Sequence, residues 1–198
     1  MNEEKTYEWH LEKENTETWM CVESVFTSEE INKIIESGNK EDTLEAELGP
    51  GPVFKLDKNI RSTIISWIPS SNKDNEWLFQ RLTDVINYSN KNFFNFDLSR
   101  IQSLQYSIYH EGGFYKDHVD LTGIKPTGAR KLSFSVMLTD PEEYEGGELL
   151  LKFGYNITPP NKKGDIIFFP SYVLHEVTPV TKGTRKTLVG WVLGPPFK

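Results

Sequence analysis

The sequence predicts a mainly β protein of the α+β class, in which helices pack against the outside of a β core. Two helix-like segments lie in the first half of the chain, and short strand-like segments separated by Gly, Pro, Asp and Asn follow from about residue 97. Many short strands at close spacing are typical of a sandwich or barrel, and helices followed by strands are typical of α+β folds. The 198 residues contain no internal repeat or low-complexity linker. We therefore treat residues 1–198 as one domain, with a helical support over about 1–96 and a β core over about 97–195.

The first half of the chain carries two helix signals. The segment TSEEINKIIESG offers Thr27 as an N-cap with Glu30 three residues later, which is the spacing of a capping box, and Gly38 is expected to end this helix. A second helix is predicted over 73–91, where Trp and Leu recur at helical spacing and are interpreted as core packing. Strand-like segments in this half are YEWHLE at 7–12, WMCVESVF at 19–26, PVFKL at 52–56 and RSTIISWIP at 61–69.

The second half of the chain carries most of the strand signals. In EYEGGELLL, Gly146 and Gly147 are expected to form the turn of a hairpin, with Leu149 and Leu151 facing the core. The pair GG at 112–113 permits a turn or bulge. The predicted strands are 100–109, 113–118, 130–138, 147–153, 164–169, 172–179 and 185–193.

Composition disfavours several classes of function. The net charge of −7 and the pI near 5.2 argue against the broad basic surface that neutralises nucleic-acid phosphates, so no nucleic-acid partner is expected. Apolar runs fall short of the roughly 20 residues of a membrane-spanning helix, and no signal-peptide pattern opens the chain. Cys21 is the single cysteine, which suits a reducing compartment. We expect a cytoplasmic protein without a membrane partner, and the oligomeric state stays open.

A possible metal site begins with His118 and Asp120, which follow a strand signal. In a strand, residues i and i+2 project from the same face, so the imidazole and the carboxylate point into one space. A His-x-Asp pair alone is common and more often makes a surface hydrogen bond. His175, which follows the apolar run DIIFFP, supplies a third ligand that a distant strand can bring over this pair. Two His and one carboxylate form the facial triad that suits non-haem Fe(II).

Arg185 lies ten residues after His175, on the last predicted strand. Its guanidinium can grip a carboxylate in bidentate fashion, although in the absence of a triad a solvated strand cation is the simpler interpretation. His110 points away from the face of Tyr109 by strand alternation and is interpreted as structural or exposed.

Several motifs occur together in one order along the chain: YxxGGxYxxHxD at 109–120, a GGEL hairpin, KKGDxxxFPS at 162–171 and LHEVTPVTKGTR at 174–185. In this order they resemble the 2-oxoglutarate and Fe(II)-dependent oxygenases, specifically the prolyl 4-hydroxylase-like and PKHD-type hydroxylase branch. The resemblance covers about residues 98–195. It implies a double-stranded β-helix, or jelly roll, with the N-terminal helices packed outside.

The resemblance also implies roles for individual residues. His118, Asp120 and His175 are expected to bind iron as the catalytic residues, and Arg185 to bind the far carboxylate of 2-oxoglutarate. The resemblance further implies that Tyr109 lines the co-substrate or iron pocket, that Tyr115 stands near the substrate entrance, and that Trp191 lies beside the co-substrate on the face of Arg185. Some relatives use a tyrosine to assist the arginine, but this chain has Met137 flanked by Ser133 and Ser135. Whether a serine hydroxyl takes that part is open.

The implied activity is hydroxylation of a substrate C–H bond, coupled to decarboxylation of 2-oxoglutarate to succinate and CO2. Fe(II), 2-oxoglutarate and O2 are the implied cofactors and co-substrates, and ascorbate is a further candidate ligand. The substrate is a peptide, a protein or a small molecule, with a prolyl residue among the candidates. Arg185 stands where collagen-type prolyl hydroxylases usually have lysine, which argues against a strictly prolyl substrate. The alternative from another class is a non-catalytic jelly-roll or cupin-like protein that binds a metal or a carbohydrate.

Overall fold

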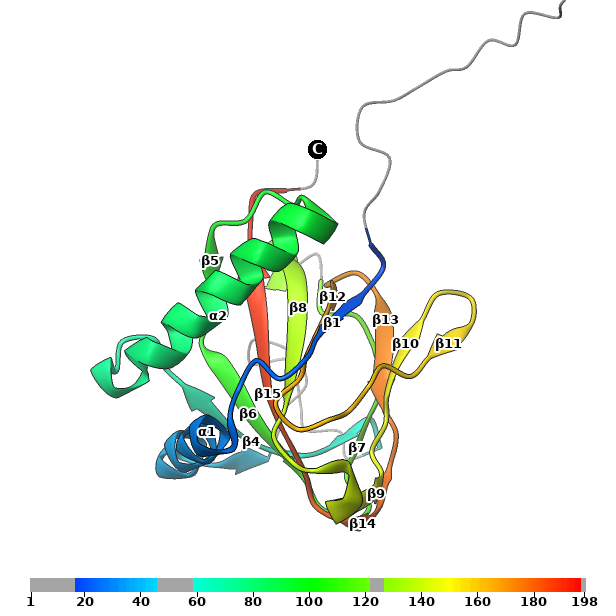
Figure 1. Ribbon diagram of the computed structural model, residues 1–198. Coiled ribbons are helices and arrows are strands. Elements are labelled where there is room, and N and C mark those ends of the chain that lie inside the picture. Colours follow the sequence, from blue (N-terminus) through cyan, green and yellow to red (C-terminus); the bar gives the residue numbers. More distant parts are fainter. Residues whose placement is uncertain (1–16, 46–58, 122–126, 197–198) are drawn as a thin grey trace, which may run out of the picture.

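Two antiparallel sheets face each other in the computed structural model, which describes residues 17–45, 59–121 and 127–196 (Figure 1). The larger sheet has the order β1 (Met20–Val22), β12 (Ile166–Pro170), β8 (Arg130–Met137), β15 (Arg185–Leu193), β6 (Leu104–Tyr109), β4 (Ile64–Ile68) and β2 (Leu44–Glu45), with β5 (Arg100–Ile101) also paired to β15. The smaller sheet has the order β11 (Asn156–Ile157), β10 (Leu149–Lys152), β13 (Leu174–Val177), β7 (Phe114–His118) and β3 (Arg61–Ser62). A separate pair joins β14 (Val180–Gly183) to β9 (Tyr144–Gly146).

The helices lie on the outer side of the larger sheet, away from the smaller one (Figure 1). The main apolar cluster joins residues of both helices to residues of that sheet, which accounts for this arrangement. The predicted class, mainly β with helices packed outside a jelly roll, is confirmed.

Helix α1 (Ser28–Lys40) begins with the predicted capping box. The Thr27 hydroxyl accepts a hydrogen bond from the Glu30 amide at 3.2 Å, and the Thr27 amide donates to the Glu30 carboxylate at 2.9 Å. The prediction that Gly38 ends the helix is wrong, because α1 continues to Lys40. Gly38 is needed for packing instead, since a Cβ at this position would overlap the Tyr106 ring of β6.

The second predicted helix, over 73–91, is confirmed and extends further. A 3₁₀ turn, η1 (Lys73–Asn75), leads into α2 (Glu76–Ser89), and a π-helical turn, η2 (Asn90–Phe94), continues it to Asn95 in the left-handed conformation. Four residues of α2 are buried on one face: Leu78, Leu82, Ile86 and Ser89.

The alternation of side chains along β12 explains how one apolar strand contributes to two hydrophobic clusters. Ile166 and Phe168 belong to the cluster beneath the helices, whereas Ile167 and Phe169 belong to a second cluster with Leu151 of the smaller sheet. Since successive side chains of a strand point to opposite faces, the run IIFF fills both the helix-facing core and the space between the sheets.

The expected hairpin at 143–151 is wrong. β9 pairs with β14, and β10 pairs with β13 and β11, so the two strands belong to different sheets. Gly146 and Gly147 have φ of 72° and 62°, and these left-handed angles carry the chain from one sheet to the other instead of closing a two-residue turn. Leu151 is buried as predicted, and Leu149 is partly buried.

The strands predicted for the N-terminal half have different outcomes. The strand predicted over 19–26 is shortened to β1, and the segment 61–69 forms β3 and β4. The strand-like segments 7–12 and 52–56 lie outside the described residues.

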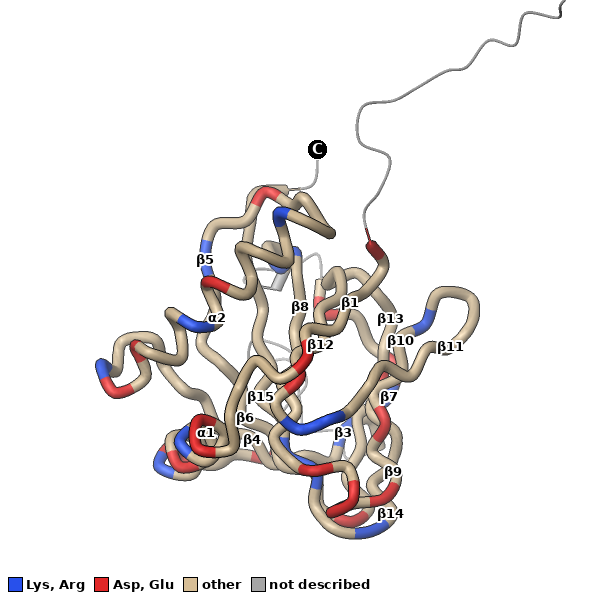
Figure 2. The backbone as a smooth tube through the Cα atoms, viewed as in Figure 1, with Lys and Arg blue, Asp and Glu red and all other residues tan. Residues whose placement is uncertain are grey.

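Among the described helices, none combines the length and the apolar character needed to cross a membrane. In the view of Figure 2, acidic and basic residues alternate over the surface elements and form no continuous basic stripe.

Gly190→Ala tests the packing behind the site. Gly190 on β15 lies opposite Phe134 of β8, and an added Cβ would overlap the Phe134 ring. Overpacking of this kind should lower the free energy of unfolding by about 1–3 kcal/mol, measured by denaturant titration. In the same experiment Phe134→Leu should relieve the overlap, so the double variant should be less destabilised than the sum of the single variants. Additive effects would contradict the contact.

Candidate functional site

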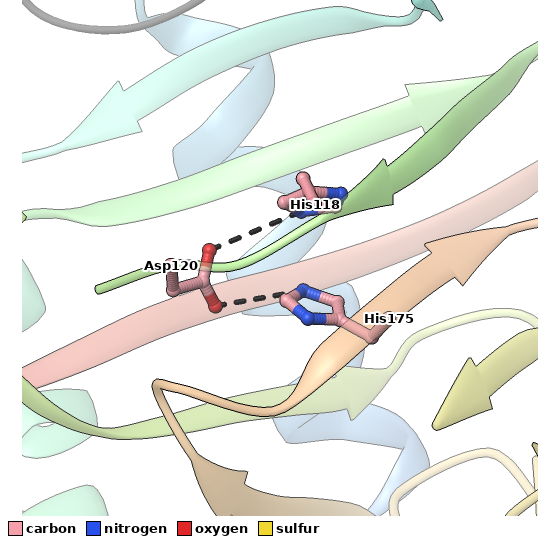
Figure 3. A group of neighbouring side chains, drawn as sticks. All are labelled: His118, Asp120 and His175. Carbon is pink, nitrogen blue, oxygen red and sulfur yellow. Dashed lines mark ion pairs between the residues drawn. The ribbon is translucent and has the colours of Figure 1, made fainter. Parts of the chain in front are cut away.

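The three predicted metal ligands come together where β7 and β13 pair. His118 lies on β7, His175 lies on β13, and Asp120 lies in the segment that follows β7. His118 ends β7 and lies opposite His175 of β13 in the antiparallel register. The chain then turns, and the Asp120 amide donates a hydrogen bond of 3.0 Å to the Ser171 carbonyl. Figure 3 shows the carboxylate facing both imidazoles, with Nε2 of His118 3.9 Å and Nε2 of His175 3.5 Å from its oxygens.

These three side chains can hold one metal ion. One donor atom from each lies within 4.8 Å of the others. Donors on one face of an ion with bonds of about 2 Å lie about 3 Å apart, so a bound ion would draw the Asp120 oxygens and the imidazole nitrogens closer together than the 3.5 and 3.9 Å seen here. The donor set of two imidazoles and one carboxylate is the set that suits non-haem iron.

Backbone contacts fix which nitrogen of each imidazole is available. Nδ1 of His118 lies 2.8 Å from the Lys116 carbonyl, and Nδ1 of His175 lies 2.9 Å from the Val173 carbonyl. A carbonyl can only accept, so Nδ1 carries the proton and Nε2 presents its lone pair to the site. Burial, helped by the nearby His175, lowers the pKa of His118 to about 3. The imidazole is therefore neutral near pH 7, as metal binding requires.

Asp120 is held in place by hydroxyl groups. The Ser133 hydroxyl donates to Oδ2 of Asp120 at 2.7 Å and is itself 2.9 Å from the Ser171 hydroxyl. Burial alone would raise the pKa of this carboxyl, but the Arg130 guanidinium and the Ser133 hydrogen bond lower it. The carboxylate is ionised and oriented.

A cavity of about 710 Å³ opens beside these ligands, between the two sheets. The possible metal ligands come from the smaller sheet or directly follow it, whereas Arg185, Thr187 and Trp191 reach the cavity from β15 of the larger sheet. Strand parity predicted that Arg185 and Trp191 share a face of β15, and both side chains line the cavity in the structure. A ligand in this cavity would contact both sheets.

Arg185 is buried in this cavity with 3% of its surface exposed. Its Cζ lies 5.3 Å from the centre of the Tyr109 ring, and one terminal nitrogen lies 4.0 Å from the sulfur of Met137, a weak acceptor. Nε has no hydrogen-bond partner, and no carboxylate of the described residues forms an ion pair with this guanidinium. A buried cation without a counter-charge is unfavourable, so the site is built to receive an anion.

The tyrosines occupy two places around the cavity. Tyr109 is buried beside Arg185, directly opposite it in the register of β6 and β15. Tyr115 stacks on the imidazole of His118 with ring centres 3.5 Å apart. His110 is exposed and hydrogen-bonds with Thr184 outside the cavity, consistent with its interpretation as structural or exposed.

Sequence reasoning missed Arg61, Arg130 and Thr187 at this site, and it did not connect Ser133 with Asp120. Ser133 was considered for the anion-binding end, but its hydroxyl contacts Asp120. Arg61 and Arg130 also line the cavity, from the first positions of β3 and β8. The available signal was strand parity: Ser133 and Ser135 alternate with large apolar residues in KLSFSVML, which marks a polar face of the strand.

Comparisons with known proteins agree with this geometry. The model of the 2OG-Fe(II) oxygenase superfamily matches residues 104–193. A PKHD-type hydroxylase of Crocosphaera subtropica is 31% identical over 184 residues, covering 87% of this chain and 77% of the relative. A PKHD-type hydroxylase of Rippkaea orientalis is 28% identical over 181 residues with the same coverage.

Solved structures share the fold. A Pseudomonas putida prolyl-4-hydroxylase matches with a TM-score of 0.69 at 20% identity, covering 90% of this chain and 93% of that chain. A Trichoplax adhaerens prolyl hydroxylase, solved with a peptide fragment of the hypoxia inducible factor oxygen degradation domain, matches with a TM-score of 0.73 at 16% identity, covering 89% of this chain and 84% of that chain.

Ser133→Ala tests the support of the carboxylate. Without the hydroxyl, Asp120 loses its only side-chain hydrogen-bond donor among the described residues, and metal affinity should fall about 10- to 100-fold. Titration of the metal-free protein with Fe(II) under argon measures this. Ser66→Ala is the matched control, since Ser66 is an equally buried serine whose hydroxyl donates to the Gly38 carbonyl. Equal affinities in both variants would show that Ser133 does not orient the ligand.

Proposed function

Because the chain belongs to the PKHD-type hydroxylases of the 2-oxoglutarate and Fe(II)-dependent oxygenase superfamily, we propose that it hydroxylates a substrate C–H bond while converting 2-oxoglutarate to succinate and CO2. Membership makes the protein an enzyme, a 2-oxoglutarate-dependent hydroxylase. The observation that carries the proposal is the meeting of His118, Asp120, His175 and an unpaired Arg185 in one cavity.

His118, Asp120 and His175 are the residues that hold the iron in this proposal. Bound Fe(II), with 2-oxoglutarate as the source of electrons, supplies the dioxygen chemistry that protein side chains cannot provide. The protein keeps the His118 imidazole neutral and the Asp120 carboxylate charged at neutral pH, and the Nδ1 contact of His175 with the Val173 carbonyl turns its Nε2 towards the site. Asp120 favours hydroxylation over halogenation, since halogenases of this type lack the carboxylate.

Arg185 binds the far carboxylate of 2-oxoglutarate in this proposal. The guanidinium lies in the larger sheet, across the cavity from the metal ligands, and has no protein counter-charge among the described residues. A dicarboxylate is therefore suited to reach the metal with one end and Arg185 with the other. Tyr109 flanks the Arg185 end of the cavity, and its ring shields the ion pair from water, whereas the Trp191 ring lies farther along β15 under the Arg130 guanidinium.

In this proposal, the group that assists Arg185 in binding that carboxylate is a hydroxyl of β15 itself. The Thr187 hydroxyl is buried, has no hydrogen-bond partner and lines the cavity two residues after Arg185. Ser135 lines the cavity too, whereas Ser133 is occupied with Asp120. We assign the assisting role to Thr187, with Ser135 as the second hydroxyl.

A peptide or protein substrate is part of the proposal. The Trichoplax adhaerens protein was solved with a peptide, and Trp67, which is 38% exposed, lines the cavity here. Tyr172, considered as part of an aromatic wall, does not line the cavity and is 51% exposed. A non-catalytic metal or carbohydrate binder is not favoured, because such a binder has no need of a buried arginine aimed at the metal cavity.

His118→Ala and Asp120→Ala test the catalytic assignment. Each removes one of three ligands, so succinate formation from 2-oxoglutarate in the presence of Fe(II) and O2 should fall to background. His110→Ala is the matched control, because His110 is exposed outside the cavity and should retain activity. Undiminished succinate formation by either ligand variant would refute the assignment.

Arg185→Gln tests the co-substrate assignment. Loss of a buried, bidentate charge-assisted contact should raise the KM for 2-oxoglutarate by about 30-fold or more. Lys186→Gln is the control, since Lys186 is the next residue of β15, does not line the cavity and carries the same charge. A similar KM in both variants would place the co-substrate elsewhere.

A further inference from the structure

We propose that the substrate presents a carboxylate to Arg61 and Arg130, two guanidinium groups of the same cavity that the metal and the co-substrate do not use. This inference deepens the proposed function and rests on it. It names the chemical class of the substrate: a molecule or peptide with a carboxylate close to the C–H bond that reacts.

Arg61 has no anionic partner in the described part of the chain. It begins β3, lies opposite Tyr115 of β7 and has 6% of its surface exposed. Its Cζ lies 4.4 Å from the centre of the Tyr115 ring, and its Nε has no hydrogen-bond partner. Stacking on the ring face leaves the N–H edge of a guanidinium available to a carboxylate.

Arg130 approaches from the larger sheet. Its Cζ lies 3.6 Å from the centre of the Trp191 ring, and its Nε donates to the Gln102 side chain at 2.8 Å. Among the described residues its one carboxylate contact is Asp120 at 4.0 Å, at the limit of an ion pair, and Asp120 already faces both imidazoles and Ser133. Burial lowers the pKa of Arg130 to about 10, so the group stays charged at neutral pH although it is poorly solvated.

The charge of the cavity lining favours an anionic substrate. Among the described residues that line it, four are arginines and Asp120 is the one carboxylate; the arginines are Arg61, Arg100, Arg130 and Arg185. In the proposed function Asp120 is engaged with the metal and Arg185 with the co-substrate. Arg61 and Arg130 then remain as two largely buried positive charges without compensation, which a bound carboxylate would neutralise.

Tyr115 links both arginines to the reactive centre. Its ring lies between the Arg61 guanidinium and the imidazole of His118. Arg130 lines the same cavity and lies 4.0 Å from Asp120, so both guanidiniums are close to the candidate metal ligands. A carboxylate held there lies beside a metal ligand.

The neighbouring surface suits an apolar body attached to that carboxylate. Trp67 and Trp191 have ring centres 6.1 Å apart and line the same cavity. The carboxylate can come from a small acylated amino acid or from an acidic side chain or C-terminus of a peptide. Both sources share the chemistry that Arg61 and Arg130 would recognise.

Matched acid and amide pairs test the proposal. The small-molecule arm uses N-acetyl amino acids and their amides, N-acetyl-proline among them. The peptide arm uses proline-containing peptides with Asp or Asn beside the proline, and with a free or amidated C-terminus. Binding is measured by calorimetry on the full chain with Fe(II) and 2-oxoglutarate under argon, and turnover by the mass gain of one oxygen in air.

At least one acid should bind about tenfold or more tightly than its amide. Arg61→Gln and Arg130→Gln should each bring that ratio close to one, whereas Lys182→Gln, which removes an exposed charge far from the cavity, should preserve it. If the preferred acid is an N-acetyl amino acid, the carboxylate belongs to a small molecule. If it is one of the peptides, the carboxylate belongs to a peptide substrate.

Succinate formation distinguishes failure of this inference from failure of the proposed function, and thermal denaturation detects variants that unfold. If the wild-type protein converts 2-oxoglutarate to succinate but no acid is preferred over its amide, this inference fails and the proposed function stands. If no succinate forms, the proposed function fails. Should a Gln variant unfold, as judged by thermal denaturation, Arg61→Lys and Arg130→Lys keep the charge but lose the bidentate fork, and their acid preference should fall at least severalfold. An unchanged ratio in the Lys or Gln variants overturns the proposal.

Discussion

The register between β7 and β13 is the constraint on which the site depends. It places His118 opposite His175, two residues that are far apart in the sequence. A slip of one residue would turn His175 to the opposite face of the sheet, away from Asp120. Apolar burial fixes the register, because Val177, on the same face as His175, packs in a cluster with Tyr109 and Val180. The metal ligands therefore owe their positions to a small hydrophobic cluster beside them.

The two sheets divide the chemistry of the cavity between them. The smaller sheet and the residue segment after β7 supply the imidazoles and the carboxylate, and β15 of the larger sheet supplies Arg185, Thr187 and Trp191. Facing sheets pack about 10 Å apart, so their packing sets the distance between the metal ligands and the arginine. The helices support the larger sheet from behind through the main apolar cluster. A molecule with two anionic ends can contact both layers, and its length is selected by the sheet spacing.

Strand parity predicted that His118 and Asp120 share one space, although Asp120 lies beyond the end of β7, and the ordered motifs of the family resemblance added His175 and Arg185. Local pattern could not predict the partners that other strands bring in. Gly38 is a helix terminator by local rules, but a tertiary contact with Tyr106 keeps it inside α1. Gly146 and Gly147 carry a hairpin signal, but the pairing of β9 with β14 overrides it. Arg61 and Arg130 acquire their significance only when β3 and β8 meet at one cavity.

Unpaired polar atoms gather where a ligand would bind. Among the described residues, four such buried groups line the cavity: Nε of Arg61, Nε of Arg185, the Thr187 hydroxyl and Nε1 of Trp191. Buried polar groups are nearly always hydrogen-bonded in folded proteins, so these four groups mark where a ligand would supply hydrogen bonds. A ligand that satisfies these groups binds the folded state only and therefore stabilises it by linkage. In the proposed function these atoms contribute binding free energy, and their positions separate an end for the co-substrate at Arg185 from an end for the substrate at Arg61.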